Sequence, residues 1–276
     1  VAKYAIEHWT RLPVEVELAS EFRYRDPVLD SNTLVVAISQ SGETADTLEA
    51  VRHAKEQKAK VLAICNTNGS QIPRECDAVL YTHAGPEIGV ASTKTFLAQI
   101  AASYLVGLAL AQARRTMFPD EVGREFRDLE AMPELISRVL ATVDSVGQLA
   151  QRFASSQTVL FLGRHVGYPV ALEGALKLKE LAYMHAEGFA AGELKHGPIA
   201  LIEDGQIVFV IVPSPRDPLS ELPGWSAESD QAGAAFGFAV SGAGDVNADG
   251  FGDVLVGAYL YDGGQADEGA VFLYFG

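Results

Sequence analysis

Ser-Gln-Ser-Gly-Glu-Thr at residues 39–44 joins an apolar run, residues 33–38, to a stretch with helical periodicity, residues 45–58. The run is rich in β-branched residues, which favours a buried strand. Two more short apolar runs follow at residues 60–64 and 78–81. A strand that leads directly into a helix and then into another strand is typical of a βαβ unit. These runs therefore predict an α/β fold built on a parallel sheet.

The stretch at residues 39–44 also places hydroxyls and unpaired backbone amides at the start of a helix. Such an end carries a partial positive charge, so it is suited to hold a phosphate without a nearby lysine. The alternative is a capping loop in which Ser41 or Thr44 satisfies the helix and nothing binds. Neither G-x-x-x-x-G-K-[ST] nor G-x-G-x-x-G occurs, so no nucleotide is implied. We call residues 39–44 the phosphate cradle.

Ligands of parallel sheets collect outside the carboxyl ends of the strands. The cradle and two further loops, residues 66–70 and 85–94, all follow predicted strands. We therefore expect the three loops to converge on one crevice. The other elements expected in the front part are helices over residues 1–11, 92–112, 119–139, 142–154 and 169–184 and strands over residues 14–16, 158–162 and 207–212.

The predicted helix 169–184 carries Glu173, Lys177 and Glu180 with i, i+4, i+7 spacing, so the three share one face. A solvated row of ion pairs would give the same pattern. The surrounding Ala, Leu and Gly residues favour burial instead, and a buried glutamate beside a lysine suits a general base. His196, in a glycine-rich loop, could move a proton near neutral pH or simply cap that loop.

Composition divides the chain near Arg216. None of the 21 basic residues, but 10 of the 36 acidic residues and 12 of the 26 glycines, lie after it. The net charge of −15 argues against nucleic acid or an anionic membrane as a partner. Cys65 and Cys76 fit no disulfide or metal framework and are expected to be buried free thiols of a cytosolic protein. The apolar run 96–111 is shorter than the roughly 20 residues that a bilayer needs, so no membrane span is expected.

The acidic tail contains a loop with the side-chain oxygens of a calcium site. Asp245, Asn247, Asp249 and Asp253 occupy positions 1, 3, 5 and 9, with glycine at position 6. It is not an EF-hand, because position 12 is Val256 and the flanks, residues 236–240 and 254–259, look like strands. The alternative is a turn that binds no metal.

Four ordered motifs make the front part resemble a known family. Residues 39–47, 91–94, 171–180 and 192–198 are similar to the isomerase half of the glutamine–fructose-6-phosphate aminotransferases, over about residues 1–215. The resemblance implies one nearly complete and one partial sugar isomerase (SIS) domain of α/β type. It also implies a homodimer formed through the SIS domains. In the family this half converts fructose 6-phosphate and ammonia to glucosamine 6-phosphate and needs no cofactor.

The resemblance also assigns roles to individual residues. It implies that Glu180 moves a proton between C1 and C2 of the sugar, that Glu173 and Lys177 support it, and that His196 assists ring opening from a neighbouring subunit. The residues implied to bind the sugar phosphate or line the sugar site are Ser39, Gln40, Ser41, Thr44, Val90 and Ser92.

Two features depart from the family's pattern. The glutaminase domain and the carboxy-terminal segment with the imine-forming lysine are missing, so we expect the chain to bind the phosphosugar but to make no glucosamine 6-phosphate from glutamine. A sensor that binds the phosphosugar without turnover is the first alternative. The tail resembles one FG-GAP repeat of the integrin α type, which offers a second alternative, an extracellular calcium-binding adhesion fragment.

The expected division of the chain follows from these observations. It comprises a first SIS domain at residues 1–115, a linking helix at 116–145, a partial second SIS domain at 146–215, a linker at 216–227 and a small β FG-GAP segment at 228–276.

Overall fold

The computed structural model describes residues 1–89, 91–202, 207–211, 236–244, 253–258 and 270–274. The chain forms two compact units. The first contains residues 1–193 and 207–213, and the second contains residues 194–206 and 214–276.

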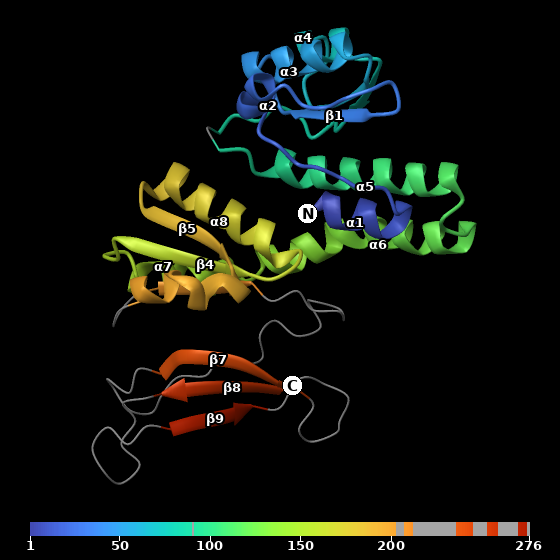
Figure 1. The fold of residues 1–276 in the computed structure, drawn as a ribbon. Helices are drawn as coiled ribbons and strands as arrows, with labels where there is room; N and C mark the ends of the chain where they lie inside the picture. Colours follow the sequence, from blue (N-terminus) through green and yellow to red (C-terminus); the bar gives the residue numbers. More distant parts are fainter. Residues whose placement is uncertain (90, 203–206, 212–235, 245–252, 259–269, 275–276) are drawn as a thin grey trace. The chain divides into compact units, whose positions relative to one another are not determined.

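The first sheet of the first unit is parallel, with strand order β1-β2-β3 (Figure 1). Its strands are β1 (Leu34–Ser39), β2 (Lys60–Cys65) and β3 (Ala78–Tyr81), and Ser39 pairs with Cys65 at the carboxyl end. All three strands and the helix α3 (Ala45–Glu56) after β1 match the sequence expectation. The core formed by α3, the sheet and the residues around them consists of Ala37, Leu48, Val51, Ala54, Ala59, Val61, Ala63 and Ile72.

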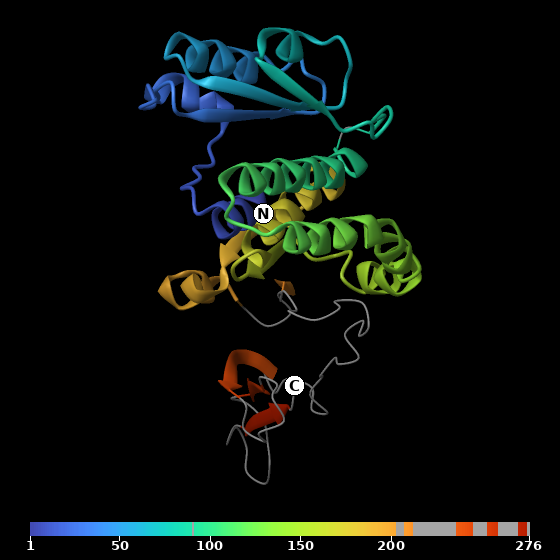
Figure 2. The same ribbon diagram turned by 90° about the vertical axis from the view of Figure 1, so that its right-hand side faces the viewer.

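Helices cover both faces of this sheet (Figures 1 and 2). α3 and the short α4 (Gln71–Glu75) lie on one face, and α5 (Lys94–Arg114) lies on the other. α2 (Ala19–Arg25) packs on α3, where Arg23 donates to Asp46 at 2.9 Å. The strand expected at residues 14–16 is wrong, because residues 12–18 form an irregular connection, in which Val16 is exposed.

The first helix, α1 (Ala2–Thr10), packs along α5. The two helices meet at Gly107 of α5, which has no side chain to separate them. A Cβ atom on Gly107 would lie 2.9 Å from Ile6 Cγ1, so the two helices approach through this glycine. Arg114 Nε donates to the Thr10 carbonyl at 3.0 Å and so satisfies the end of α1.

α5 is longer than the apolar run that predicted it. With 21 residues it is long and apolar enough to cross a membrane by length and composition alone, and a third of its most apolar window is buried. The length argument against a membrane span is therefore wrong. One such helix is weak evidence for a span, because a core helix of a soluble protein passes the same test, and α5 contacts α1, β2 and α6.

The next two helices, α6 (Pro119–Leu140) and α7 (Val143–Arg152), contain no buried residue. Glu121 Oε2 accepts from the Phe118 amide at 2.6 Å at the start of α6. Both helices nevertheless present large apolar side chains to solvent, namely Phe126, Met132, Val139, Leu140, Val143, Val146 and Leu149.

The second sheet repeats the βαβ pattern with the order β5-β4-β6, all parallel. Its strands are β4 (Thr158–Gly163), β5 (His185–Ala190) and β6 (Ile207–Ile211), and α8 (Gly167–Ala182) packs on them. Small residues bring α8 close to the sheet. A Cβ on Gly174 would lie 2.8 Å from Phe161 Cε1, and one on Gly188 would lie 2.9 Å from Leu172 Cα.

The second unit has its own sheet. β7 (Phe236–Gly244), β8 (Asp253–Ala258) and β9 (Ala270–Tyr274) pair in that order and run antiparallel. β7 and β8 lie where the sequence predicted strands, whereas β9 was not predicted. The unit also contains the end of the 3₁₀ helix η1 (Ala191–His196) and η2 (Pro198–Leu201).

Candidate functional site

The phosphate cradle is a tight turn between β1 and α3. Ser39 is buried, and its Oγ accepts from the Gly42 amide at 3.0 Å and lies 3.5 Å from Thr44 Oγ1. Gly42 has a φ of 70°, in the left-handed region that favours glycine. The turn therefore gathers the hydroxyls of Ser39 and Thr44 at the start of the helix.

No side chain of the cradle caps α3. Thr44 is the N-cap residue, but its side chain makes no capping hydrogen bond, and Ser41 Oγ accepts from the Glu43 amide at 3.2 Å, before the helix begins. The capping alternative therefore lacks its hydrogen bond in the described structure. The N–H groups in the first turn of α3 can donate hydrogen bonds to a bound anion.

The three loops expected at the carboxyl edge of the first sheet do come together. Thr67 Oγ1 donates to the Gln40 carbonyl at 3.2 Å, and Asn66 Nδ2 donates to the Gly85 carbonyl at 2.7 Å. Asn66 Oδ1 also accepts from Thr82 Oγ1 at 2.9 Å. The loop after β2 is thus tied to the cradle on one side and to the loop after β3 on the other.

We expect Gly42→Ala to destabilise the protein by about 2–3 kcal/mol, because a Cβ there would lie 2.0 Å from Ser70 Oγ and 2.9 Å from Cys65 Sγ and would be held at positive φ. Urea unfolding measures the change. Gly69→Ala is a matched control, since Gly69 has φ 74° and no atom lies within 4 Å of its Cβ position, so only about 1 kcal/mol of backbone strain is expected. Equal losses in the two variants would contradict the close packing beneath the cradle.

α8 brings the three predicted charged residues together. Lys177 Nζ lies 2.6 Å from Glu180 Oε2 and 3.4 Å from Glu173 Oε1. The side chains are only 24% exposed for Lys177 and Glu173 and 33% for Glu180, so the row is not a fully solvated one. Partial burial lowers the pKa of Lys177, but the hydrogen bond to Glu180 and the charge of Glu173 outweigh it, and the pKa lies above its ordinary value.

A cavity of about 360 Å³ lies beside this row. Glu173 and Lys177 line it from α8, and Ser92 lines it from the loop before α5. Glu180 is not among its lining residues. The others are Thr93, Phe96, Leu97, Phe161, Val170, Gly174 and Ile211, so the charged groups enter a largely apolar space.

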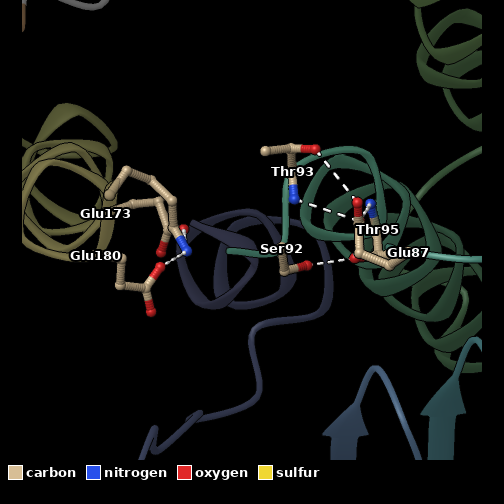
Figure 3. Close-up of polar contacts among 7 residues, drawn as sticks. Glu87, Ser92, Thr93, Thr95, Glu173 and Glu180 are labelled. Carbon is tan, nitrogen blue, oxygen red and sulfur yellow. Dashed lines mark hydrogen bonds and ion pairs between the residues drawn. The ribbon is translucent and has the colours of Figure 1, made fainter. Parts of the chain in front are cut away.

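Ser92 contacts Thr95, which is held in turn by a carboxylate that the sequence analysis missed, that of Glu87 (Figure 3). Glu87 Oε2 accepts from Thr95 Oγ1 at 2.7 Å, from the Thr95 amide at 3.2 Å and from the Thr93 amide at 3.3 Å. Thr95 Oγ1 in turn contacts Ser92 Oγ. The hydrogen bond from the Thr95 hydroxyl is the main cause of a lowered pKa for Glu87. The sequence signal that could have revealed Glu87 is a carboxylate shortly before a Ser-Thr-x-Thr helix start.

The remaining predicted site residues lie in the second unit or outside the described residues. His196 ends η1, is exposed and belongs to the second unit. Val90 lies outside the described residues, as do Asp245, Asn247 and Asp249. Asp253 begins β8, where it pairs with Gly244 at the end of β7.

Both cysteines are free thiols, as expected. Cys65 is fully buried beneath the cradle, whereas Cys76 is only partly buried, so the expected burial holds for Cys65 alone. Burial raises the pKa of Cys76 to about 11, so its thiol is protonated at neutral pH.

Most of the first unit matches a known protein family. The SIS domain family matches residues 1–109 and 152–221. The chain belongs to the SIS domain family. The FG-GAP repeat family matches residues 236–274 of this SIS protein, the stretch that holds β7 to β9.

Two curated relatives of the SIS protein share one name. The glutamine–fructose-6-phosphate aminotransferase (isomerizing) of Mycolicibacterium paratuberculosis is 87% identical over 216 residues, and that of Streptomyces coelicolor is 73% identical over 216 residues. Each match covers 78% of this chain but 35% of the relative. The chain thus spans about a third of the length of these relatives.

A solved structure relates the chain to the same aminotransferases. The C-terminal domain of glucosamine-fructose-6-phosphate aminotransferase from Francisella tularensis superposes with a TM-score of 0.76 at 42% identity and covers 79% of this chain and 62% of that chain. The resemblance to the isomerase half of these aminotransferases is confirmed for this SIS protein, and so is its α/β fold of parallel sheets flanked by helices.

Proposed function

We propose that the first unit binds fructose 6-phosphate or glucosamine 6-phosphate, as part of the sugar-isomerising half of a glutamine–fructose-6-phosphate aminotransferase. The observation that carries the proposal is the uncapped start of α3, where the hydroxyls of the cradle gather beside donors suited to a phosphate. The names of the curated relatives supply the sugar. The proposal does not include the glutaminase step or the imine-forming step of the family.

Within this proposal each group has one task. Ser39, Gln40, Ser41 and Thr44 hold the phosphate. Val90 and Ser92 line the sugar site, and Glu180 carries a proton between C1 and C2. Lys177 holds Glu180 in place through its 2.6 Å contact, with Glu173 on its other side, and no cofactor takes part.

The proposal gives His196 its task from a second subunit, where it assists ring opening. It therefore includes a homodimer formed through the SIS part. The exposed apolar side chains of α6 and α7 support a self-association surface. Sedimentation equilibrium tests the dimer, and a cytosolic location belongs to the same proposal.

Ser41→Ala combined with Thr44→Ala should weaken fructose 6-phosphate binding at least about tenfold, because hydrogen bonds to a charged phosphate contribute more than those between neutral groups. Isothermal titration calorimetry with the full chain measures it. Ser137→Ala with Thr142→Ala is the matched control, since those hydroxyls donate to the main-chain carbonyls of Pro133 and Val139 and belong to no predicted site.

Two results would contradict the assignment. Unchanged affinity in the cradle variant would show that the phosphate sits elsewhere, and a wild-type chain that binds neither sugar phosphate at millimolar concentration would remove the proposed function. Binding without proton exchange on the sugar would favour the sensor alternative.

We further propose that the FG-GAP stretch binds Ca²⁺ weakly. The pairing of Gly244 with Asp253 supports this, because it joins the strands on either side of the predicted calcium loop. Asp245, Asn247, Asp249 and Asp253 would hold the ion through their oxygens. An affinity of about 10⁻⁴–10⁻³ M is expected, as in extracellular calcium modules, and a Ca²⁺ titration of the chain followed by NMR tests it.

A further inference from the structure

The cluster around Glu87 does more than cap a helix. Thr95 is completely buried, so its hydroxyl has no access to water and depends on the partners that the protein supplies. These partners are Glu87 on one side and Ser92 on the other. Of the three residues, Ser92 lines the cavity into which Lys177 and Glu173 also project. In Figure 3 Ser92 lies between the Glu87 cluster and the charged row of α8.

The direction of the hydrogen bonds follows from counting hydrogens. The lowered pKa of Glu87 keeps it ionised at neutral pH, and an ionised carboxylate only accepts. The Thr95 hydroxyl has a single hydrogen, which it donates to Glu87 Oε2 at 2.7 Å. Ser92 must therefore donate its own hydrogen to Thr95 Oγ1. The cavity then meets the lone pairs of Ser92 Oγ and not its hydrogen.

We propose that Glu87 and Thr95 are positioning residues that orient Ser92 as a hydrogen-bond acceptor for a hydroxyl group of the bound sugar. The inference rests on the proposed function, because it needs a sugar in the cavity. It adds a specificity rule: at this point the site selects a ligand O–H donor over a carbonyl or phosphate oxygen. Removing the Thr95 hydroxyl frees Ser92 to rotate, and the acceptor is no longer held in place.

The test compares fructose 6-phosphate affinities of the full chain by calorimetry. Ser92→Ala, Thr95→Val and Glu87→Ala should each weaken binding by about 3- to 10-fold, the value of one hydrogen bond. Combining Thr95→Val with Ser92→Ala should weaken it no further than either change alone, because both act through one hydroxyl. Thr95→Ser keeps the hydroxyl and should bind within about twofold of wild type. Ser103→Ala, which removes another buried hydroxyl of α5, is the control.

Each result decides the matter. The inference would be overturned if the losses of affinity caused by Thr95→Val and Ser92→Ala multiplied in the double variant. It would also be overturned if Thr95→Ser bound as weakly as Thr95→Val. A threonine with a purely structural role predicts both results. If all three single variants bound fructose 6-phosphate as tightly as wild type, this inference would be overturned and the proposed function would stand. Absence of wild-type binding would overturn it together with the proposed function. If Thr95→Val does not fold, Ser92→Ala and Glu87→Ala with their double variant give the same comparison.

Discussion

We expect Gly163→Ala to lower the free energy of unfolding by at least about 3 kcal/mol, because the added Cβ has no room beside main-chain atoms. It would lie 2.1 Å from the Gly167 carbonyl oxygen and 2.6 Å from the Tyr168 nitrogen. Those atoms belong to the first turn of α8, so they cannot rotate away as a side chain could. The helix must shift from β4 and take Lys177 and its partners with it. Fructose 6-phosphate binding should fall in the same variant.

Thermal unfolding measures the effect, and a midpoint lowered by roughly 6–12 °C is expected for a protein of this size. Gly147→Ala is the control. Gly147 lies within α7 with nothing within 4 Å of its Cβ position, so alanine there should stabilise the protein by about 0.5–1 kcal/mol through helix propensity. A Gly163→Ala protein that unfolds within about 1 °C of wild type would contradict the close contact between β4 and α8.

The largest expected effect on activity comes from Glu180→Gln. A general base removes the C1 proton of an open-chain ketose phosphate and returns it at C2, and such a group contributes typically about 10²- to 10⁴-fold in rate. Lys177 donates to Glu180 Oε2, which leaves the other carboxylate oxygen for the substrate proton. Glutamine keeps the shape but cannot take up that proton. We therefore expect deuterium exchange at C1 of fructose 6-phosphate in D₂O, followed by NMR, to slow by about this factor.

The exchange experiment has its own control and its own limit. Glu134→Gln changes an exposed glutamate of α6 and should leave the exchange rate unchanged. Exchange by Glu180→Gln at the wild-type rate would assign the base to another residue. A wild-type chain that binds the sugar but exchanges no proton would restrict the first unit to binding.

Much of the first unit could be predicted because its elements are defined locally. The strands β1, β2 and β4 are short apolar runs, and α3 and α8 follow them directly, so period and composition were enough. β5 was missed, since its sequence, His-Ala-Glu-Gly-Phe-Ala, is neither continuous in apolar residues nor strictly alternating. It becomes a strand because β4 lies beside it in register, from Thr158 with His185 onward. Tertiary pairing overrode a weak local signal.

The site was predictable in part for the same reason. Glu173, Lys177 and Glu180 were found because helical spacing places them on one face, and the cradle was found because a strand leads into a helix there. Glu87 was missed because its partners Thr93 and Thr95 form a helix start whose boundary the sequence set two residues too early. No local pattern reveals that Ser92 and Lys177, far apart in the chain, line one cavity.

The packing of α1 on α5 has a consequence for synthesis on the ribosome. Thr10 and Arg114, which join the two helices, are 104 positions apart. At about 5–20 residues per second, roughly 5–20 s pass between the appearance of α1 and that of its partner. During this interval the side chains of Ile6 and Trp9, which meet α5 around Gly107, have no surface to cover them. The nascent chain thus exposes the apolar face of α1 to chaperones until α5 has been made.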